Sequence, residues 1–272
     1  MPKYSLHIAI VAFVVLLFMG GCSKENGPQE FRATITRPTD DQKISLSGTK
    51  LYWASGDKIR VYDELSNQAD YILTGGVSAS RGVFKFDDGA VLSSGPYSVV
   101  YPADARTGVH QINLPYIQYT PDGSLSDVPL YGETSTTAVD FYHMCGVVRF
   151  RLSATTAVSL SRITLATDIN TNGTSTFSGS GTKVAVTAPN GNNVTTMACD
   201  VAQSIASPND FYMYLPPGRY NTFRVLMTAA NGSVCAMHAN RPIVVERGKI
   251  VTITLSGLVF TATASAPRKH PR

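Results

Sequence analysis

Apolar and polar residues alternate along most of this chain, and turn residues separate the alternating runs. In the segment FRATITR at residues 31–37, Phe31, Ala33 and Ile35 alternate with polar residues. Successive side chains of a β-strand point to opposite faces, so this pattern predicts a half-buried strand. The same period recurs in the segments KIRVY (58–62), GVFKF (82–86), VVRFRL (147–152), FRVLM (223–227) and KIVTITL (249–255).

Tight-turn signals lie between these runs, and few segments carry a helical period. Asn-Gly or Asp-Gly pairs, which supply the positive φ angles of two-residue hairpins, occur at 88–89, 122–123, 172–173, 190–191 and 231–232. The sequence therefore predicts an all-β protein built from antiparallel meanders or Greek keys. The polar segment GETSTTAVD at 132–140 is the best candidate boundary, which gives two β-sandwich domains at residues 28–137 and 138–267.

The composition agrees with an extracellular β-sheet protein. Charged residues make up 15% and apolar residues 43%, and Ser, Thr, Gly and Asn supply much of the remainder. The formal net charge is +4, of which Lys3 accounts for one and three basic residues in the tail at 268–272 account for the rest. The body between them is neutral, which argues against a nucleic-acid partner, because such a surface needs a concentrated basic face.

The N-terminus carries an apolar run of another kind. Lys3 precedes about 14 apolar or small residues at 8–21, fewer than the roughly 20 of a membrane-spanning helix and typical of a signal peptide. Gly20-Gly21-Cys22 then resembles a bacterial lipobox, whose cysteine is acylated; the alternative is an ordinary signal with a chance cysteine. We expect a lipoprotein signal peptide at 1–21, a lipid on Cys22 that anchors the chain to the outer membrane, and a linker at 22–27.

One stretch carries a family resemblance. In LYWASGDKIRVYD (51–63), the only tryptophan, Trp53, precedes a Gly56-Asp57 turn and then Ile59 and Val61. This arrangement resembles the W-x-x-G-D-x-I-x-V segment of the fimbrillins, which are type V pilus subunits of Bacteroides-type bacteria and their Mfa-like surface lipoprotein relatives. Further segments follow in family order: YSVVYPAD (97–104), INLPYIQYTPDG (112–123), VDFYHMCGVVRFRL (139–152), DFYMYLPPGRYNTFRVLM (210–227) and VERGKIVTITL (245–255).

The resemblance implies two transthyretin-like β-sandwich domains and assembly by donor-strand exchange. In that process a protease cuts after an arginine and removes the first strand with its lipid, and a strand of the next subunit fills the groove. FRATITR is the candidate first strand. No cleavage site stands out, because Arg37 precedes Pro38, Arg32 lies within the strand, and a cut after Arg60 would divide KIRVY.

The candidate donor strand is LVFTATASA at 258–266. Its residues Leu258, Phe260, Ala262 and Ala264 would share one face, although two alanines would fill a groove poorly. The alternative is a short terminal edge strand followed by a frayed basic tail.

Motifs that carry chemistry are sparse. DINTNG (168–173) matches the first half of a calcium loop, but Gly179 stands where a bidentate glutamate is needed, so a hairpin turn is predicted. His143 and Cys145 would share a strand face without further ligands, which indicates core packing. Cys145, Cys199 and Cys235 allow at most one disulfide, or three free thiols. The absence of a Gly-x-Ser-x-Gly elbow, a P-loop and a His-Glu-x-x-His pair predicts no cofactor, no metal and no enzymatic activity.

These observations favour a fimbrillin-like cell-surface lipoprotein, acting as a structural or accessory (tip or adhesin) subunit of a type V pilus. Its partners would be other pilus subunits, bound by β-strand addition, and host or bacterial surface ligands. The alternative is a non-polymerising surface lipoprotein that binds glycans, for which the tyrosines of NLPYIQYTPDG (113–123) and DFYMYLPPGRY (210–220) would provide aromatic platforms.

Overall fold

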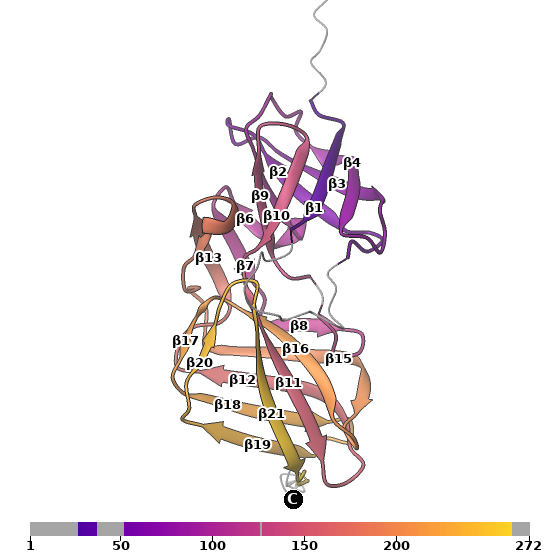
Figure 1. Ribbon diagram of the computed structural model, residues 1–272, viewed down its shortest axis with the longest axis vertical. Coiled ribbons are helices and arrows are strands. Elements are labelled where there is room, and N and C mark those ends of the chain that lie inside the picture. Colours follow the sequence, from indigo (N-terminus) through magenta and orange to yellow (C-terminus); the bar gives the residue numbers. More distant parts are fainter. Residues whose placement is uncertain (1–26, 37–51, 126, 263–272) are drawn as a thin grey trace, which may run out of the picture.

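The computed structural model describes residues 27–36, 52–125 and 127–262. Figure 1 shows two lobes stacked along the long axis, with the N-terminal strands in the upper lobe and most of the C-terminal strands in the lower one. Within the described ranges, the only helices are two single turns of 3-10 helix, η1 (Ala103–Ala105) and η2 (Gly181–Lys183). The predicted all-β class is therefore confirmed.

The upper lobe is a closed barrel of seven strands. Their order is β1-β10-β9-β5-β2-β3-β4, and β4 pairs back onto β1. Inward-facing aromatic and aliphatic residues, including Phe31, Trp53 and Phe84, fill one core. The strands are β1 (Glu30–Ile35), β2 (Lys58–Tyr62), β3 (Gln68–Gly75), β4 (Arg81–Gly89), β5 (Tyr97–Tyr101), β9 (Leu130–Thr134) and β10 (Ala138–His143).

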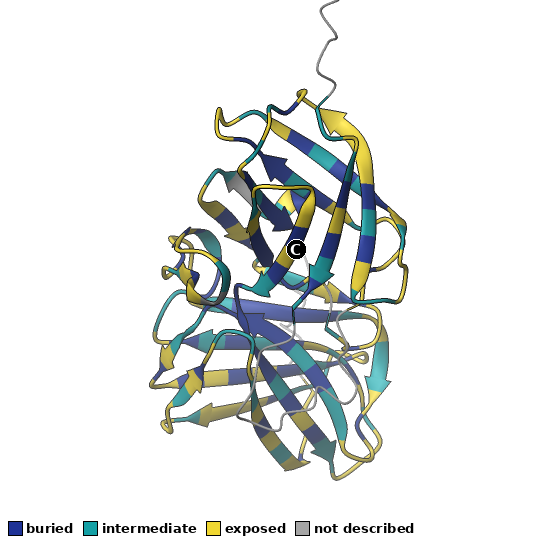
Figure 2. Ribbon diagram, turned by 45° about the horizontal axis from the view of Figure 1, so that its top comes forward, coloured by how far each residue is buried: buried dark blue, intermediate teal, exposed yellow. Residues whose placement is uncertain are grey.

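The lower lobe is a sandwich of two sheets. The order β16-β11-β21 makes one sheet and β19-β18-β12-β15-β8 the other, and buried residues of both fill the space between them. Figure 2 shows buried and exposed positions alternating along these strands, as the sequence pattern requires. The strands are β8 (Ile117–Thr120), β11 (Gly146–Ala154), β12 (Ser159–Thr167), β15 (Val194–Ser204), β16 (Asn209–Leu215), β18 (Phe223–Ala229), β19 (Val234–Ala239) and β21 (Ile250–Leu258).

A third core joins the lobes. It combines Val100 and Tyr131 of the barrel with Val147 and Tyr214 of the sandwich strands and with Cys145, which lies between β10 and β11. Small sheets surround it: β6 (Arg106–Gly108), β7 (Gln111–Leu114), β13 (Gly173–Ser178) and β14 (Ala185–Val186) form one, and β17 (Gly218–Tyr220) and β20 (Ile243–Val245) form another. Because β7 pairs with β13 and β8 pairs with β15, the N-terminal half of the chain contributes strands to both lobes.

Three details differ from the sequence prediction. The first lobe closes into a barrel instead of forming a two-sheet sandwich. The polar segment at 132–140 is the β9–β10 hairpin, so the barrel continues to His143, past the predicted boundary at 137. Three pairs, β1 with β10, β8 with β15 and β11 with β21, are parallel. Parallel pairs join segments far apart in sequence, so no local turn signal reveals them.

The turn predictions had mixed outcomes. Asn231-Gly232 is a hairpin between β18 and β19, with Gly232 at φ +83°. Asp88-Gly89 instead lies within β4, where both residues pair with β3. A Cβ at Gly89 would lie 2.6 Å from the Gln68 carbonyl oxygen, so this glycine serves the close approach of two strands.

None of the described residues belongs to a helix that is long and apolar enough to span a membrane.

Candidate functional site

The first feature of functional interest is strand β1, which closes the barrel. It runs parallel to β10 and antiparallel to β4, as Figure 1 shows. Phe31, Ala33 and Ile35 are buried, as the alternation predicted. The Phe31 ring meets Tyr71 and Tyr97 edge-on, with centroids 4.8 and 5.2 Å away. Backbone N–H groups of Arg32 and Ile35 donate to the Thr137 and Ser80 carbonyl oxygens, both at 2.8 Å, so the strand is held on both sides.

The tryptophan of the family segment lies at the centre of the barrel core. Trp53 is 1% exposed, and its ring contacts Phe84, Tyr101 and Phe141 edge-on at centroid distances of 4.9, 5.3 and 5.6 Å. Gly82 gives this ring its space, because a Cβ there would lie 2.7 Å from Trp53 Cδ1. The role of Trp53 is thus packing.

The Gly56-Asp57 pair forms the turn that leads into β2. Gly56 has φ +91°, and a Cβ there would meet nothing within 4 Å. Glycine is therefore favoured at this position by the backbone conformation alone. The Ala54 N–H donates to Asp57 Oδ2 at 2.7 Å, and the Asp57 N–H donates to the Ala54 carbonyl oxygen at 3.1 Å. Ile59 and Val61 follow with no exposed surface. These four positions and Trp53 therefore organise the barrel locally.

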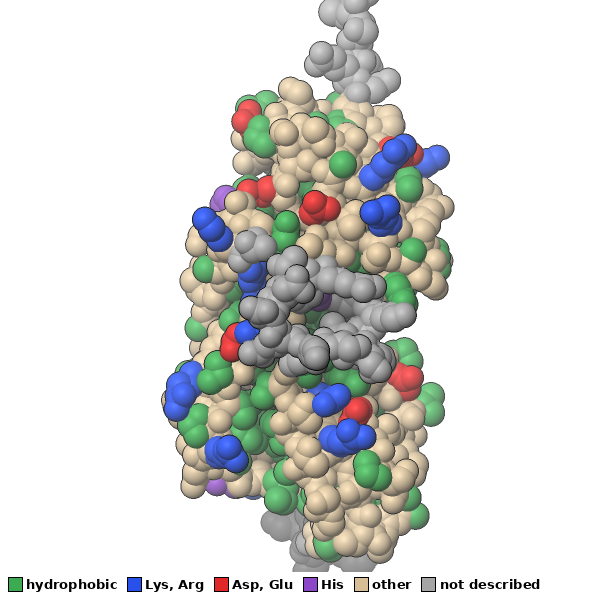
Figure 3. All heavy atoms as spheres, viewed as in Figure 1, with side chains coloured by type: hydrophobic (Ala, Val, Ile, Leu, Met, Phe, Trp, Pro, Cys, Tyr) green, Lys and Arg blue, Asp and Glu red, His purple; other side chains and the backbone are tan. Residues whose placement is uncertain are grey.

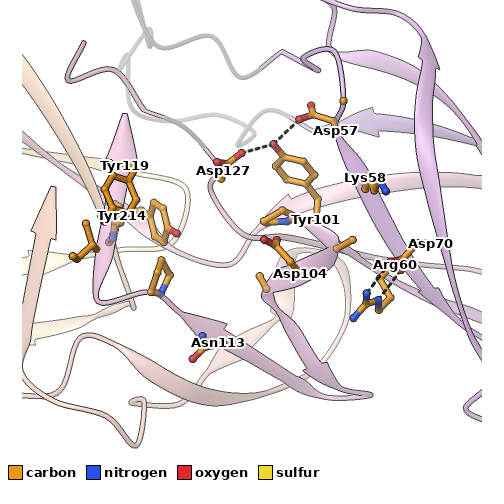
Figure 4. A pocket seen from close by; sticks show the side chains of 17 residues that line it. Asp57, Lys58, Arg60, Asp70, Tyr101, Asp104, Asn113, Tyr119, Asp127 and Tyr214 are labelled. Atoms are coloured by element: carbon orange, nitrogen blue, oxygen red, sulfur yellow. Dashed lines mark hydrogen bonds and ion pairs between the residues drawn. The ribbon is translucent and has the colours of Figure 1, made fainter. Parts of the chain in front are cut away.

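Asp57 also takes part in a three-residue cluster at the end of the barrel (Figure 4). The Tyr101 hydroxyl lies 3.0 Å from an oxygen of Asp57 and 3.0 Å from an oxygen of Asp127. Burial raises the pKa of Tyr101 far above its usual value, and the two carboxylates raise it further. Burial also raises the pKa of Asp57, and the Asp127 charge adds to this, while bonds from Ala54 and Tyr101 oppose it. One phenolic hydrogen thus serves two acceptors.

This cluster borders a pocket of about 640 Å³ between the lobes. In Figure 4 the wall from the barrel carries Asp57, Lys58, Arg60 and Asp70, and Tyr119 and Tyr214 lie across from it. Arg60 donates two hydrogen bonds to Asp70, at 2.6 and 2.8 Å. The volume is within the roughly 300–1,000 Å³ of small-molecule sites.

Gln118 holds the pocket's sandwich wall together. Its side-chain Nε2 donates to the Tyr214 carbonyl oxygen at 2.7 Å, and its Oε1 accepts from the Tyr214 N–H at 3.0 Å. This amide acts like a peptide group of a neighbouring strand and links β8 of one sheet to β16 of the other. Gln118 belongs to the family-like segment INLPYIQYTPDG, but nothing in the sequence identified its partner.

His143 and Cys145, the pair at strand spacing, are structural residues, and Cys145 is fully buried while His143 is partly buried. Burial lowers the pKa of His143 from 6.5 to about 4, and the Arg247 charge adds to the shift. Burial raises the pKa of the Cys145 thiol well above its usual value. Cys145, Cys199 and Cys235 are all free, which is the second of the two alternatives. A buried, neutral thiol is a poor nucleophile and a poor metal ligand.

The calcium-like segment also has a structural role. Asp168 accepts hydrogen bonds from the Asn221 N–H at 3.0 Å and from Asn221 Nδ2 at 3.0 Å, and these lower its pKa. Asn172 donates to the side chain of Asn192 at 2.8 Å, which joins this segment to the one at 190–194. Within the ranges that the structure describes, no three His, Cys, Asp or Glu side chains converge on a point that could hold a metal ion.

The predicted donor segment is partly docked on its own lobe. Leu258 is the last residue of β21 and is 3% exposed in the sandwich core. Phe260 packs against that core, and Thr261 exchanges two 2.9 Å backbone hydrogen bonds with Val234. Ala262 is exposed, and Ala264 lies outside the described residues. Cys22, the predicted lipidation site, also lies outside them.

Charge is dispersed on the face drawn in Figure 3. Lys and Arg side chains of the described residues alternate there with Asp and Glu among uncharged groups. Ion pairs among the described residues include Lys58 with Asp87 at 2.7 Å.

Solved structures resemble this fold. A "putative cell adhesion protein" from Bacteroides ovatus aligns with a TM-score of 0.52 and 12% identity, covering 88% of this chain and 96% of that one. Another from Bacteroides uniformis aligns with a TM-score of 0.46 and 15% identity, covering 87% and 96%. The tip fimbrial protein Mfa3 from Porphyromonas gingivalis, with a C-terminal truncation, aligns with a TM-score of 0.31 and 10% identity, covering 85% of this chain and 98% of that one.

The chain has the fold of the B. ovatus cell adhesion protein. The expected resemblance to adhesion proteins of Bacteroides-type bacteria is thereby confirmed at the level of the fold. No protein-family model matches the sequence, and no curated protein matches it.

Sequence reasoning missed Tyr101, Asp127 and the pocket. The segment YSVVYPAD placed Tyr101 in a strand end, but the two carboxylates that meet its hydroxyl are 44 and 26 residues away. The one local signal is Asp127 itself, because Asp is among the few residues that tolerate its positive φ of 51°.

Proposed function

We propose that this chain is a fimbrillin-like cell-surface lipoprotein that serves as a structural or accessory subunit of a type V pilus and mediates adhesion. The observation that supports this best is the position of β1. It is the first described strand, and it completes the barrel between β4 and β10. Neither of these strands is adjacent to β1 in the sequence. Such a strand can be exchanged for an equivalent one without altering the order of the others.

The groove that β1 occupies suits an incoming apolar strand. Removal of Phe31, Ala33 and Ile35 would expose the aromatic core and leave two strand edges unpaired. Burial of side chains such as Phe and Ile contributes about 1.5–3 kcal/mol each. A donor with apolar residues at alternate positions would recover this energy together with the backbone hydrogen bonds.

The proposed donor strand is released from its own lobe more easily from Phe260 onward than from Leu258 onward. Leu258 lies in the core of its own sandwich, so its withdrawal would open that core. Among the described residues, release from Phe260 onward requires the loss of the partial packing of Phe260 and of the hydrogen bonds between Thr261 and Val234. The donor face would then consist of Phe260, Ala262 and Ala264.

Two of the three candidate cleavage sites are protected. Arg32 lies within β1 and pairs on both sides, and Arg60 lies in β2 between β3 and β5. Arg37 is the only arginine in the sequence between β1 and β2. It is therefore the one candidate left, although the proline after it makes its peptide bond a poor protease substrate. If the chain polymerises, we therefore propose Arg37 as the maturation site.

The test uses the full chain from residue 22 with Cys22 replaced by serine, treated with an arginine-specific protease. Ladders resistant to SDS and fibres in electron micrographs are expected, and Arg37→Ala should abolish both. Glu30 and Lys85 are paired across β1 and β4, so Glu30→Cys/Lys85→Cys should lock β1 in place when oxidised and permit assembly when reduced. A cut monomer that never assembles, even after reduction, would contradict the polymerisation proposal.

Membrane attachment through Cys22 has its own test. In bacteria that make this protein, Cys22→Ser should move it from the outer-membrane fraction to the soluble fraction. An unchanged membrane fraction would overturn the lipoprotein assignment.

A second candidate function is a non-polymerising surface lipoprotein that binds glycans. The observation that favours it is the pocket between the lobes, with Tyr119 on its wall.

A further inference from the structure

The pocket between the lobes has an excess of negative charge. Asp70 is neutralised by Arg60, and the Lys58 ammonium pairs with Asp87 at 2.7 Å. Asp57, Asp104 and Asp127 also line the pocket, and none of them forms an ion pair with a described residue. A ligand that carries a carboxylate, sulfate or phosphate would be repelled there.

Asp127 is held at the pocket by an uncommon backbone conformation. Its φ of 51° lies in the left-handed region, which few residues other than glycine adopt, and its side chain is directed toward the Tyr101 hydroxyl (Figure 4). Tyr101 has one hydrogen for two carboxylate oxygens, and although Asp57 also accepts from the Ala54 N–H, exposed Asp127 keeps room for a further donor. A ligand hydroxyl group at this point would supply it.

The opposite wall offers an aromatic surface. Tyr119, on β8, is 64% exposed and lines the pocket. Tyr116, three residues earlier in the chain, is 47% exposed but is not among the residues that line the pocket. A flat, exposed ring provides an apolar platform with a polar edge. Asn113, also on the wall and exposed, supplies an amide that both donates and accepts.

From this combination we propose that the pocket binds an uncharged carbohydrate of one to a few pyranose units. Tyr119 covers the apolar C–H face of a sugar ring, and Asp57, Asp127 and Asn113 bond to its hydroxyl groups. Acidic glycans are excluded by the three carboxylates. The inference rests on the proposed adhesive role, for which it names the ligand class and the site.

Binding is tested on the uncut chain with Cys22→Ser, by saturation-transfer NMR and calorimetry. The probes are lactose, maltotriose, mannotriose and N,N′-diacetylchitobiose, with sialyllactose and spermidine as charged comparators. At least one neutral probe should bind saturably. Tyr119→Ala and Asp127→Asn should each weaken it by about tenfold or more, whereas Tyr119→Phe and the matched control Tyr116→Ala should retain it.

Three results would overturn the proposal: no binding of any neutral probe, equal binding by Tyr119→Ala, or preferential binding of spermidine or sialyllactose. Because the assay uses the monomer, it does not depend on strand exchange. Tyr119→Ala should still form fibres after proteolysis if the wild-type chain does, so failure of the ligand assignment and failure of the pilus assignment give different results.

Discussion

Replacement of Phe31 by alanine tests whether β1 is an integral part of the barrel. Phe31 has no exposed surface and meets Tyr71 and Tyr97 edge-on. A buried Phe→Ala change costs about 3–5 kcal/mol, from lost transfer free energy and from the cavity left behind. Since small domains unfold with only about 5–15 kcal/mol, this is a large part of the barrel's stability.

The chain provides its own reporter for this experiment. Trp53 is the only tryptophan, and it lies in the same barrel core as Phe31. Urea unfolding followed by its fluorescence therefore measures the barrel, and linear extrapolation gives the free energy of unfolding. We expect Phe31→Ala to lower that free energy by about 4 kcal/mol.

Arg32→Ala is the matched control. Arg32 is the next residue of the strand, and its side chain is 77% exposed and, among the described residues, pairs with Glu30 at 3.3 Å. Surface changes of this kind alter stability by about 0.5 kcal/mol or less. If Phe31→Ala cost no more than Arg32→Ala, β1 would not be packed as described, and the exchange mechanism would lose its basis.

Three further predictions follow from the structure. Gly56→Ala should destabilise the barrel by about 1–2 kcal/mol through its φ of +91° alone, measured by Trp53 fluorescence; no loss would mean that the turn relaxes. Gln118→Leu should cost about 2–4 kcal/mol in urea unfolding, because the N–H and C=O of buried Tyr214 lose their partner. Gln118→Glu should also lower stability, because its carboxylate accepts from the N–H but faces a carbonyl oxygen that needs a donor; no loss in either variant would contradict the bidentate role. His143 should make stability fall on acidification: its pKa drops from 6.5 unfolded to about 4 folded, so the unfolded chain binds the proton first. That contribution is complete above pH 6.5 and is lost toward pH 4, by up to about 3 kcal/mol; His143→Asn should flatten this part of the pH profile, and an unchanged slope would refute the assignment.

The sequence alone determined the strands and their faces. Alternation in FRATITR identified Phe31, Ala33 and Ile35 as inward residues, and the structure buries all three. The Gly56-Asp57 turn and the Asn231-Gly232 hairpin could also be predicted from the sequence, because a positive φ restricts which residue types can occupy a position. These features depend on near neighbours in the chain, which is the range over which residue patterns carry information.

Tertiary structure decided which strands pair and what lies between them. The β9–β10 hairpin looked like a domain linker, since the same polar residues suit both, and only the parallel pairing of β10 with β1 showed that the barrel continues. The bond from Gln118 to Tyr214 spans 96 residues, and the Asp57–Tyr101–Asp127 cluster brings together three separate segments. Such contacts form because the lobes bury a common core, and burial selects partners by shape and hydrogen bonding irrespective of their distance along the chain.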